Sequence, residues 1–361
     1  MLGDLFEIQS TKSFNVDALT EGNEYDYVTR TSLNQGVLRT TGFVNRENIN
    51  CAGTWSLGLL QMDFFYRSKP WYAGQFVRKN VPKIEIPEEA TPYFTAVLNQ
   101  KKSQLLQVLV RNVDSAFKKC TVKLPINTEG KIDFDIIKSF VVALKKECLK
   151  RVSDYLKSSG LVHYELSLAE EKSVDNFEKI KWEEFVVGTL FEKIETTKLP
   201  YQASELPNQP DGLYTLPCLT SSFRNQGLNY FAPRENASIL KNVISIPSNS
   251  DVYRAYFQSD EFTVLSDAYT IRWKDESRIL SESQYLFMVT CINKVTDLSI
   301  YSYKNKLGGW EAVKKKKIQL PVLNGKLDYR FMEDLVWTIK KVFIKNVVLY
   351  VESELMKESN Y

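Results

Sequence analysis

Gly3-Asp4-Leu5-Phe6-Glu7-Ile8 returns much later in the chain as Gly188-Thr189-Leu190-Phe191-Glu192-Lys193-Ile194. Two further pairs keep the same order: Asn34-Gln35-Gly36 with Asn225-Gln226-Gly227, and Arg46-Glu47-Asn48 with Arg234-Glu235-Asn236. The last pair is Leu124-Pro125 with Gly130 to Phe134, and Leu320-Pro321 with Gly325 to Tyr329. A repeat of this length predicts two duplicated domains rather than a solenoid of short units. The separation drifts slightly from pair to pair, as small loop insertions after a duplication would cause.

The composition is that of a globular protein large enough for two domains. The chain has 361 residues, of which 43% are hydrophobic and 25% are charged, so each half can bury a core of its own. The net charge of +3 neither indicates nor excludes nucleic acid, because basic residues can gather on one face. No stretch approaches the ~18 to 20 apolar residues of a membrane span, and no leader pattern is present. We therefore expect a cytoplasmic protein without membrane contact.

The usual sequence signatures of catalysis and of metal or cofactor binding are missing. The five cysteines are scattered without a C-x-x-C pair, which argues against a disulfide framework and against a zinc site. His163, the only histidine, has no cluster of ligands around it and is interpreted as an ordinary surface or linker residue. We find no phosphate-binding loop, no dinucleotide turn and no Asn-Pro-Pro-Tyr motif. We therefore expect no enzyme activity, no metal and no cofactor.

Each half combines a sheet-containing segment with a long helix. Residues 1–94 and 188–290 contain short runs of aromatic and β-branched residues between Gly, Asn and Pro, which predicts compact α/β lobes. Residues 136–156 and 331–355 have apolar residues three or four apart, which predicts amphipathic helices of roughly 25 residues and ~37 Å. Neither lobe can cover such a stripe along its whole length, so we predict that the helices pack against each other. The alternative, two unrelated core helices, ignores their equivalent places in the repeat.

A segment from Ser167 to Val187 leads into the second lobe, whereas no counterpart precedes Gly3. We therefore expect the first lobe to be supported by another element, either the end of the C-terminal helix or a partner subunit.

Each lobe opens on a segment like Gly-Asp-Leu-Phe-Glu-Ile, carries a turn such as Thr31 to Val37, and leads into a long helix. In this arrangement the chain resembles the specificity subunits of restriction-modification systems. The segments Val122 to Phe134 and Ile318 to Tyr329 are similar to the BcgI-like branch of type IIB systems, with type I specificity subunits as close relatives. The resemblance covers nearly the whole chain.

This resemblance implies an α/β fold with two tandem target-recognition domains, separated by two long helices that form an antiparallel, coiled-coil-like spacer. The domains would cover residues 1–94 and 188–290, and the spacer regions would cover residues 95–187 and 291–361. Each domain would read one half of a split site in double-stranded DNA, and the helices would dock methyltransferase or fused methyltransferase-nuclease subunits. The helix length agrees with this expectation, because ~37 Å is close to the ~34 Å of one turn of B-DNA.

Two polar loops contain side chains that could read DNA bases. The first has Arg30, Thr31, Ser32, Asn34 and Gln35, and the second has Thr220, Ser221, Arg224, Asn225 and Gln226. Asn and Gln can bond adenine, Arg can bond guanine, and Ser or Thr can bond several bases. The alternative is that Asn-Gln-Gly is a tight turn that needs Gly for its backbone. Since readers of unlike half-sites should differ, Arg30 and Arg224 are better candidates than the shared Asn and Gln.

Further candidates for DNA binding lie outside these loops. Arg67-Ser68-Lys69-Pro70-Trp71-Tyr72 interleaves basic and aromatic residues, so Lys69 and Tyr72 are candidates, with a place in the core as the alternative for the aromatic residues. Lys12 and Lys198 each follow a Thr and are candidates for phosphate contacts. The rival interpretation of the whole chain is a duplicated structural adaptor that binds protein partners and not DNA.

Overall fold

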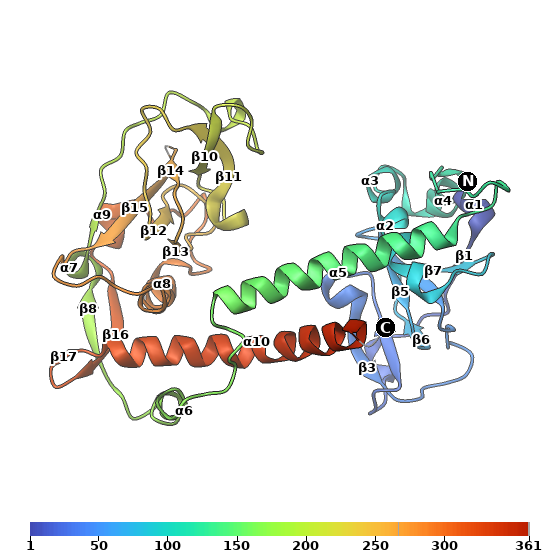
Figure 1. Ribbon diagram of the computed structural model, residues 1–361, viewed down its shortest axis with the longest axis horizontal. Helices are drawn as coiled ribbons and strands as arrows, with labels where there is room; N and C mark the ends of the chain where they lie inside the picture. The colour runs from blue at the N-terminus through green and yellow to red at the C-terminus, as the bar shows by residue number, and fades with distance from the viewer. Residues whose placement is uncertain (266, 360–361) are drawn as a thin grey trace. The chain divides into compact units, whose positions relative to one another are not determined.

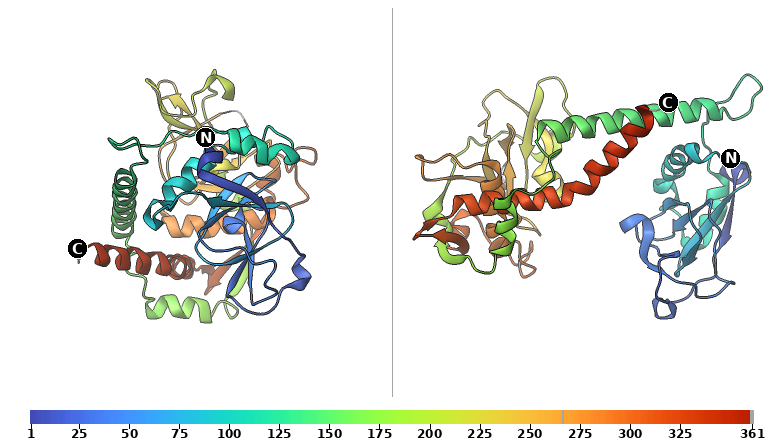
Figure 2. Two further views of the ribbon diagram at one scale, coloured as in Figure 1. Left: turned by 90° about the vertical axis from the view of Figure 1, so that its right-hand side faces the viewer. Right: turned by 60° about the horizontal axis from the view of Figure 1, so that its bottom comes forward.

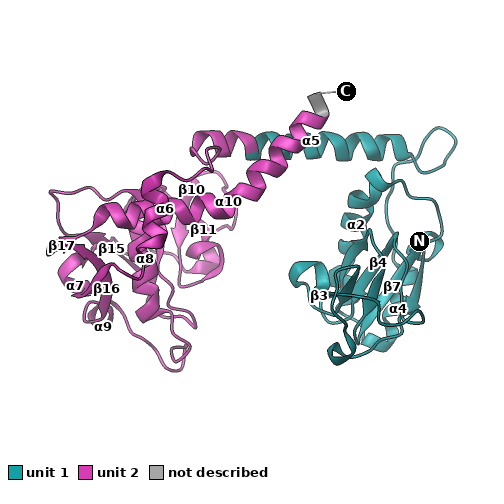
Figure 3. Cartoon of the chain, turned by 90° about the horizontal axis from the view of Figure 1, so that it is seen from below, with its two compact units in different colours: residues 1–152 teal, residues 153–361 magenta. Residues whose placement is uncertain are grey.

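The computed structural model describes residues 1–265 and 267–359. The chain forms two compact units, Met1–Val152 and the residues from Ser153 onward, which Figure 3 shows in different colours. The boundary lies inside helix α5 (Phe134–Ser158), so this helix contributes to both units. Each unit has its own sheets and its own core.

The first unit is built on a four-stranded antiparallel sheet in the order β1-β7-β4-β5. Its strands are β1 (Phe6–Ser10), β7 (Val77–Pro82), β4 (Thr54–Gly58) and β5 (Asp63–Arg67). The motif that begins at Gly3 therefore forms an edge strand, preceded by a single turn of helix, α1 (Leu2–Leu5). Phe6 and Ile8 alternate with exposed or half-buried residues and are buried, as expected for a strand with one face on the core.

A second sheet of the first unit has three strands in the order β3-β2-β6. They are β3 (Val37–Thr41), β2 (Tyr25–Val28) and β6 (Trp71–Ala73). Strands β2 and β3 are antiparallel and are joined through the first Asn-Gln-Gly turn, whereas β2 and β6 are parallel, with Val28 opposite Ala73. Because parallel strands end at the same edge of a sheet, the residues after Val28 and those after Ala73 are brought together.

Short helices pack on the four-stranded sheet of the first unit. They are α2 (Thr91–Asn99), α3 (Lys102–Leu105) and α4 (Val113–Lys119). Phe94 and Phe117 of these helices share one core with Trp55 and Phe64 of the strands, and this core reaches Ile137 at the start of α5. The first lobe therefore continues well past residue 94, and these helices support it from within its own unit.

The second unit repeats this plan strand for strand. The order β9-β15-β12-β13 repeats the order β1-β7-β4-β5, and β11-β10-β14 repeats β3-β2-β6, again with a parallel pair. The strands are β9 (Phe191–Lys193), β15 (Ala268–Trp273), β12 (Val243–Pro247), β13 (Tyr256–Gln258), β11 (Leu228–Pro233), β10 (Tyr214–Leu219) and β14 (Thr263–Val264). The predicted duplication is confirmed; Figure 1 labels most of these strands, and Figure 2 shows the chain from two further sides.

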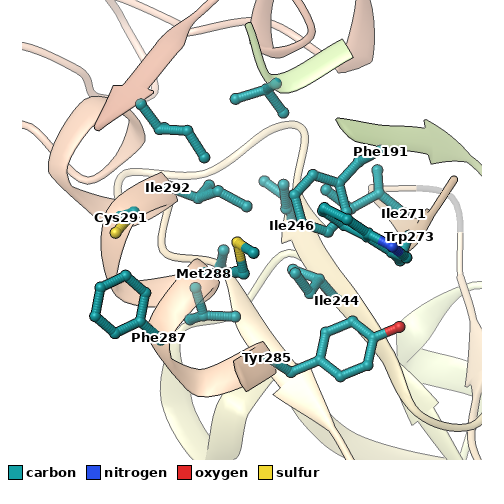
Figure 4. Packing of buried hydrophobic residues seen from close by; sticks show 14 of the residues in the cluster. Phe191, Ile244, Ile246, Ile271, Trp273, Tyr285, Phe287, Met288, Cys291 and Ile292 are labelled. Carbon is teal, nitrogen blue, oxygen red and sulfur yellow. The ribbon is translucent and has the colours of Figure 1, made fainter. Parts of the chain in front are cut away.

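The core of the second unit lies between its four-stranded sheet and helix α8 (Glu282–Thr296). Figure 4 shows Ile244 and Ile271 of the sheet near Met288 and Ile292 of the helix. Helix α8 begins at a capping box, in which Ser281 and Gln284 satisfy each other's backbone N–H groups. The predicted end of the second lobe at residue 290 falls inside this helix. Since the helix packs on the sheet along its length, the lobe includes the whole helix.

The second unit has a third sheet, with β8 (Lys181–Val186), β16 (Lys317–Leu323) and β17 (Lys326–Leu327). Strand β8 comes from the lead-in segment Ser167 to Val187, and it pairs with β16. Ile318 and Leu320 of β16 are buried, whereas their repeat counterparts Val122 and Leu124 are half-buried. Among the described residues no strand pairs with residues 121–124.

Both predicted long helices are present. Helix α5 has 25 residues, and α10 (Tyr329–Ser359) has 31. The first turns of α10 are buried in the core of the second unit through Met332 and Leu335. Other apolar residues on the amphipathic faces of the two helices are exposed to solvent: Leu144 of α5 is 52% exposed, and Phe343 of α10 is 80% exposed. None of the helices within the described ranges is long and apolar enough to span a membrane.

A polar contact joins α10 to the short helix α6 (Leu168–Asp175) of the linker. Glu170 accepts a hydrogen bond at 2.9 Å from the Nζ of Lys341, and both side chains are largely buried. The Thr338 hydroxyl donates to the backbone carbonyl of Glu170 at 3.0 Å. Satisfied polar groups of this kind fix one arrangement of two helices, because any other arrangement leaves a buried charge unpaired.

Candidate nucleic-acid interface

The two Asn-Gln-Gly turns have the same uncommon backbone. Asn and Gln have φ of 46° and 53° in the first turn (Asn34-Gln35-Gly36), and of 45° and 53° in the second (Asn225-Gln226-Gly227). The glycines that follow have φ of 80° and 88°. Left-handed backbone is uncommon for residues other than Gly, Asn and Asp, and two such residues in sequence carry a conformational cost. Other contacts must therefore hold each turn in place.

The Asn side chain closes each turn. Asn34 Nδ2 donates to the carbonyl of Val37 at 3.2 Å, and Asn225 Nδ2 donates to the carbonyl of Leu228 at 2.5 Å. An Asn side chain that bonds nearby backbone is a recurrent reason for Asn in turns. The bond uses one of the two amide N–H groups and ties the side chain to the turn. The interpretation of the shared Asn as a turn residue is therefore the better supported one.

A buried side chain from the four-stranded sheet clamps each turn. Arg67 of β5 is 3% exposed, and its guanidinium donates to the Gln35 carbonyl and, at 2.8 and 2.9 Å, to the Ser56 hydroxyl. Gln258 of β13 is 4% exposed, and its amide donates to the Gln226 carbonyl at 3.1 Å and to the Ser245 hydroxyl at 2.9 Å. Burial lowers the pKa of Arg67 to about 10, which keeps the side chain charged at neutral pH. The clamp is thus shared in geometry and different in charge.

An open hollow lies beside each turn, at the carboxyl ends of the parallel strands. In the first lobe, residues after β2 and β6, among them Arg30 and Gln75, line a hollow of about 630 Å³, the first hollow. In the second lobe, residues after β10 and β14, among them Ser221 and Asp267, line a hollow of about 590 Å³, the second hollow. The short helices η1 (Val16–Ala18) and η5 (Ala203–Glu205) border them in equivalent places.

Polar side chains without partners surround both hollows, and they differ between the lobes. They are Asp17, Arg30, Gln61 and Gln75 in the first hollow and Asn208, Ser221, Arg224, Asn229 and Asp267 in the second. Across the described ranges, none of these side chains forms a hydrogen bond or ion pair, and Arg30 only stacks over the Phe76 ring at 5.4 Å. Their donors and acceptors are therefore available to a ligand.

Other predicted loop residues hold the loops together. Thr31 Oγ1 accepts from the backbone N–H of Leu33 at 3.1 Å, and the Ser32 hydroxyl donates to the carboxylate of Asp63. Thr220 Oγ1 donates to the carbonyl of Gly227 at 3.3 Å. Gln35 and Gln226 are exposed, and their backbone carbonyls accept the clamp bonds.

The candidates outside the loops have different surroundings. Lys69 forms an ion pair with Asp26 at 2.9 Å. Tyr72 is completely buried, and its hydroxyl donates to the carbonyl of Asn45 at 2.9 Å. A side chain in that position cannot contact DNA, so our prediction for Tyr72 is replaced by a role in the core. Lys12 is exposed and lies 3.8 Å from Glu47.

Lys198 is also exposed and lines a separate hollow of the second lobe, which it shares with Glu192, Glu195 and Glu311. These acidic neighbours weaken the case for a phosphate contact there, because they repel the DNA backbone. His163 lies exposed between α5 and α6, as predicted for a surface residue.

Sequence reasoning missed six polar members of the two hollows: Asp17, Gln61, Gln75, Asn208, Asn229 and Asp267. No local pattern marks them. Gln75 reaches the Arg30 loop only because β6 pairs in parallel with β2, and that pairing is not visible in the sequence.

One known protein family matches most of the chain. Residues 1–153 and 179–349 match the family described as "Type I restriction modification DNA specificity domain". No curated protein matches the chain.

Solved structures that align with nearly the whole of this chain have low sequence identity to it. The S subunit of a type I restriction-modification system from M. genitalium has 14% identity and a TM-score of 0.47, over 99% of this chain and 91% of its own. The HsdS subunit from Thermoanaerobacter tengcongensis has 10% identity and a TM-score of 0.30, over 98% and 90%. A chain from a study of complex assembly and conformational transition in the type I R-M system has 11% identity and a TM-score of 0.34, over 98% and 95%.

Proposed function

Because the chain belongs to the family of type I restriction modification DNA specificity domains, we propose that each of its two lobes reads one half of a split site in double-stranded DNA. Family membership gives the chain a role in DNA sequence specificity without catalysis of its own. What the chain recognises is then set by side chains that differ between two copies of one scaffold.

The observation that carries this proposal is the contrast between shared and unshared residues. The two lobes share strand order, turn backbone and clamp geometry. They differ in the polar side chains around the hollows, where Arg30 and Gln75 stand in one lobe and Ser221 and Asp267 in the other. Phosphate contacts position a protein and base contacts specify sequence, so a common scaffold with unlike free side chains suits two unlike half-sites.

We further propose that α5 and α10 form the antiparallel spacer and dock methyltransferase or fused methyltransferase-nuclease subunits. Within the second unit, Leu156 of α5 and Val348 and Val351 of α10 are buried beside a common apolar hollow of about 580 Å³. The exposed apolar residues farther along both helices, such as Leu144 and Phe343, provide surface for a partner. A neighbouring gene for one fused methyltransferase-nuclease would assign a type IIB system, and separate methyltransferase and translocase genes would assign type I.

Among the residues predicted from the sequence, Arg30, Ser221 and Arg224 remain our candidates for base contacts, because they line the hollows with free side chains. Lys12 remains a candidate for a phosphate contact. We also propose that the protein is located in the cytoplasm, together with the DNA it reads. The domain ranges are best drawn with the lobe cores, which extend past residue 94 to Ile137 and past residue 290 through α8.

The proposed function is tested by exchange of one lobe. Residues 1–133 are replaced by the equivalent lobe of a relative, and methylated sites are mapped in cells that also express the partner subunits. We expect one half of the methylated sequence to change and the other half to stay. If both halves change together, or neither changes, the two-lobe reading is wrong.

A duplicated adaptor that binds only proteins is the rival function. Binding of the full chain with its partners to mixed-sequence duplex DNA should fall steeply with salt, because phosphate contacts release counterions. Binding that is absent at low salt would favour the adaptor.

A further inference from the structure

The first and second hollows occupy the same topological place in two lobes of unlike sequence. Each opens where two parallel strands end, β2 and β6 in the first lobe and β10 and β14 in the second. The backbone there is built in the same way, since Gly74 N–H donates to the Val28 carbonyl and Leu265 N–H donates to the Leu219 carbonyl, both at 2.8 Å. Parallel strands direct successive loops to one edge, which is where open α/β sheets bind ligands.

Part of the polar lining of each hollow is free, in contrast to the bonded side chains of the turns next to it. Thr31, Ser32 and Asn34 bond within their own loop or to its neighbours. Gln75 and Asp267, in contrast, are exposed, and their side chains form no hydrogen bond to the residues that the structure describes. A surface that reads base edges needs such unsatisfied donors and acceptors, held on a rigid support. Backbone hydrogen bonds supply that support: Gly74 and Phe76, on either side of Gln75, bond to Val28 and Leu59, and the Asp267 carbonyl accepts from Ser248 N–H at 2.9 Å.

The acidic residues of the hollows decide between two kinds of DNA contact. Asp17 lies in the first hollow and Asp267 in the second. A carboxylate that faces the DNA backbone is repelled by phosphate, whereas a carboxylate that faces a base can accept a hydrogen bond from an amino group, most often the N4 of cytosine. An amide side chain such as that of Gln75 matches the N6 and N7 atoms of adenine. The lining therefore fits base edges better than the sugar-phosphate chain.

We propose that the two hollows are the base-reading sites of the lobes, with Gln75 reading an adenine in the half-site of the first lobe and Asp267 reading a cytosine in the half-site of the second. Arg30 and Arg224, which line the same hollows, offset the negative charge of the carboxylates and reach neighbouring bases. This inference rests on the proposed function, because it assigns residues to a DNA-reading role that the lobes must already have.

The experiment uses the full chain in complex with its methyltransferase partners and a duplex DNA library of random sequence. Bound DNA is sequenced for the wild type, for Gln75→Ala and for Gln100→Ala. Gln100 is another exposed Gln of the first unit, at the end of α2 and outside the hollow. We expect Gln75→Ala to lose ~5- to ~150-fold of the preference for adenine at one base pair. Gln100→Ala should select the wild-type motif.

The second lobe is tested in the same way with Asp267→Ala and, as its control, Glu276→Ala, an exposed acidic residue of the same unit outside the second hollow. We expect Asp267→Ala to lose the preference for cytosine at one base pair in the half of the motif that Gln75→Ala leaves intact. An unchanged motif in both hollow variants, or equal weakening for every sequence, overturns the assignment of the hollows while DNA specificity stands. If the wild type selects no motif, the proposed function itself fails.

Discussion

Arg67 in the first lobe and Gln258 in the second occupy equivalent places, and each donates a hydrogen bond to the carbonyl of the Gln in its Asn-Gln-Gly turn. Two different side chains thus hold the same left-handed backbone. Arg67 brings a charge into the protein interior, where burial lowers its pKa and the nearby carboxylate of Asp26 partly offsets that effect. The first lobe therefore holds its turn with a charged group where the second uses a neutral amide.

The clamp predicts which substitutions release the first turn. Arg67→Leu removes the donors to the Gln35 carbonyl and the Ser56 hydroxyl, and leaving such groups unsatisfied costs about 1 to 3 kcal/mol. Arg67→Gln copies the second lobe and should retain most of the contact. We expect hydrogen exchange of residues 29–41, measured by mass spectrometry, to speed up strongly in Arg67→Leu and weakly in Arg67→Gln. Equal exchange in both variants would mean that the turn holds without the clamp.

Arg30 and Arg224 line the two hollows and should each read a base. A guanidinium that bonds guanine O6 and N7 discriminates by about 1 to 3 kcal/mol. We expect Arg30→Ala to relax the methylated motif at one base pair of one half, and Arg224→Ala to do so in the other half. Methylome sequencing of cells with each variant and its partner subunits measures this. An intact motif with less methylation throughout would instead assign both residues to phosphate contact or to folding.

The open stripes of α5 and α10 predict that assembly is more sensitive than folding. Leu144 and Ile339 are 52% and 47% exposed, so an Asp at either place costs the isolated chain little. Burial of the same Asp against an apolar partner costs several kcal/mol. We expect Leu144→Asp with Ile339→Asp to abolish co-purification with the methyltransferase while the thermal unfolding curve of the chain stays nearly unchanged.

The matched control for these helices is Ser139→Asp with Asn346→Asp, which places the same charges at exposed polar positions of α5 and α10. This control should assemble normally. Wild-type assembly by the Leu144 and Ile339 variant would remove these stripes from the proposed interface.

The contact between Glu170 and Lys341 predicts a loss of stability in acid. Burial alone raises the pKa of Glu170, but the backbone N–H of Ser167 and the ammonium of Lys341 outweigh it, and the pKa lies below its ordinary value of 4.5. The contribution is therefore complete above about pH 4.5 and is lost as the pH falls through the lowered pKa of the folded state. We expect Glu170→Gln to lose about 1 to 3 kcal/mol at neutral pH.

Urea denaturation of the wild type and Glu170→Gln, followed at a series of pH values from about 7 to about 3, measures this linkage. The difference between the two proteins should shrink towards acid pH. A constant difference at every pH would show that the charge of Glu170 does not contribute.

Much of the architecture was predictable because it depends on local pattern. The repeated segments at Gly3 and Gly188 indicated two equivalent lobes, since each segment brings its strand and turn signals with it. The spacing of apolar residues predicted α5 and α10, because a helix is defined by contacts within one or two turns. The Asn-Gln-Gly turns were recognisable for the same reason, since their Asn and Gly requirements are local.

The site, in contrast, depended on contacts between distant residues. The sequence run from Arg67 to Tyr72 has the composition of a DNA surface, yet the structure uses Arg67 as a clamp, pairs Lys69 with Asp26 and buries Tyr72. Arg and Tyr carry both apolar and polar atoms, so composition alone does not decide whether they lie inside or outside. The pairing of the strands decided which of these side chains lie inside the protein and which lie on its surface.

By itself, the sequence determined that the chain consists of two copies of one lobe, each followed by a long helix. Only the tertiary structure decided which polar residues meet. The parallel pairing of β2 with β6 joins Arg30 to Gln75 in one hollow, and that of β10 with β14 joins Ser221 to Asp267 in the other. The physical reason is that backbone hydrogen bonds between strands are the same for every residue type. Which strands pair is therefore settled by the packing of the whole lobe and not by a local signal.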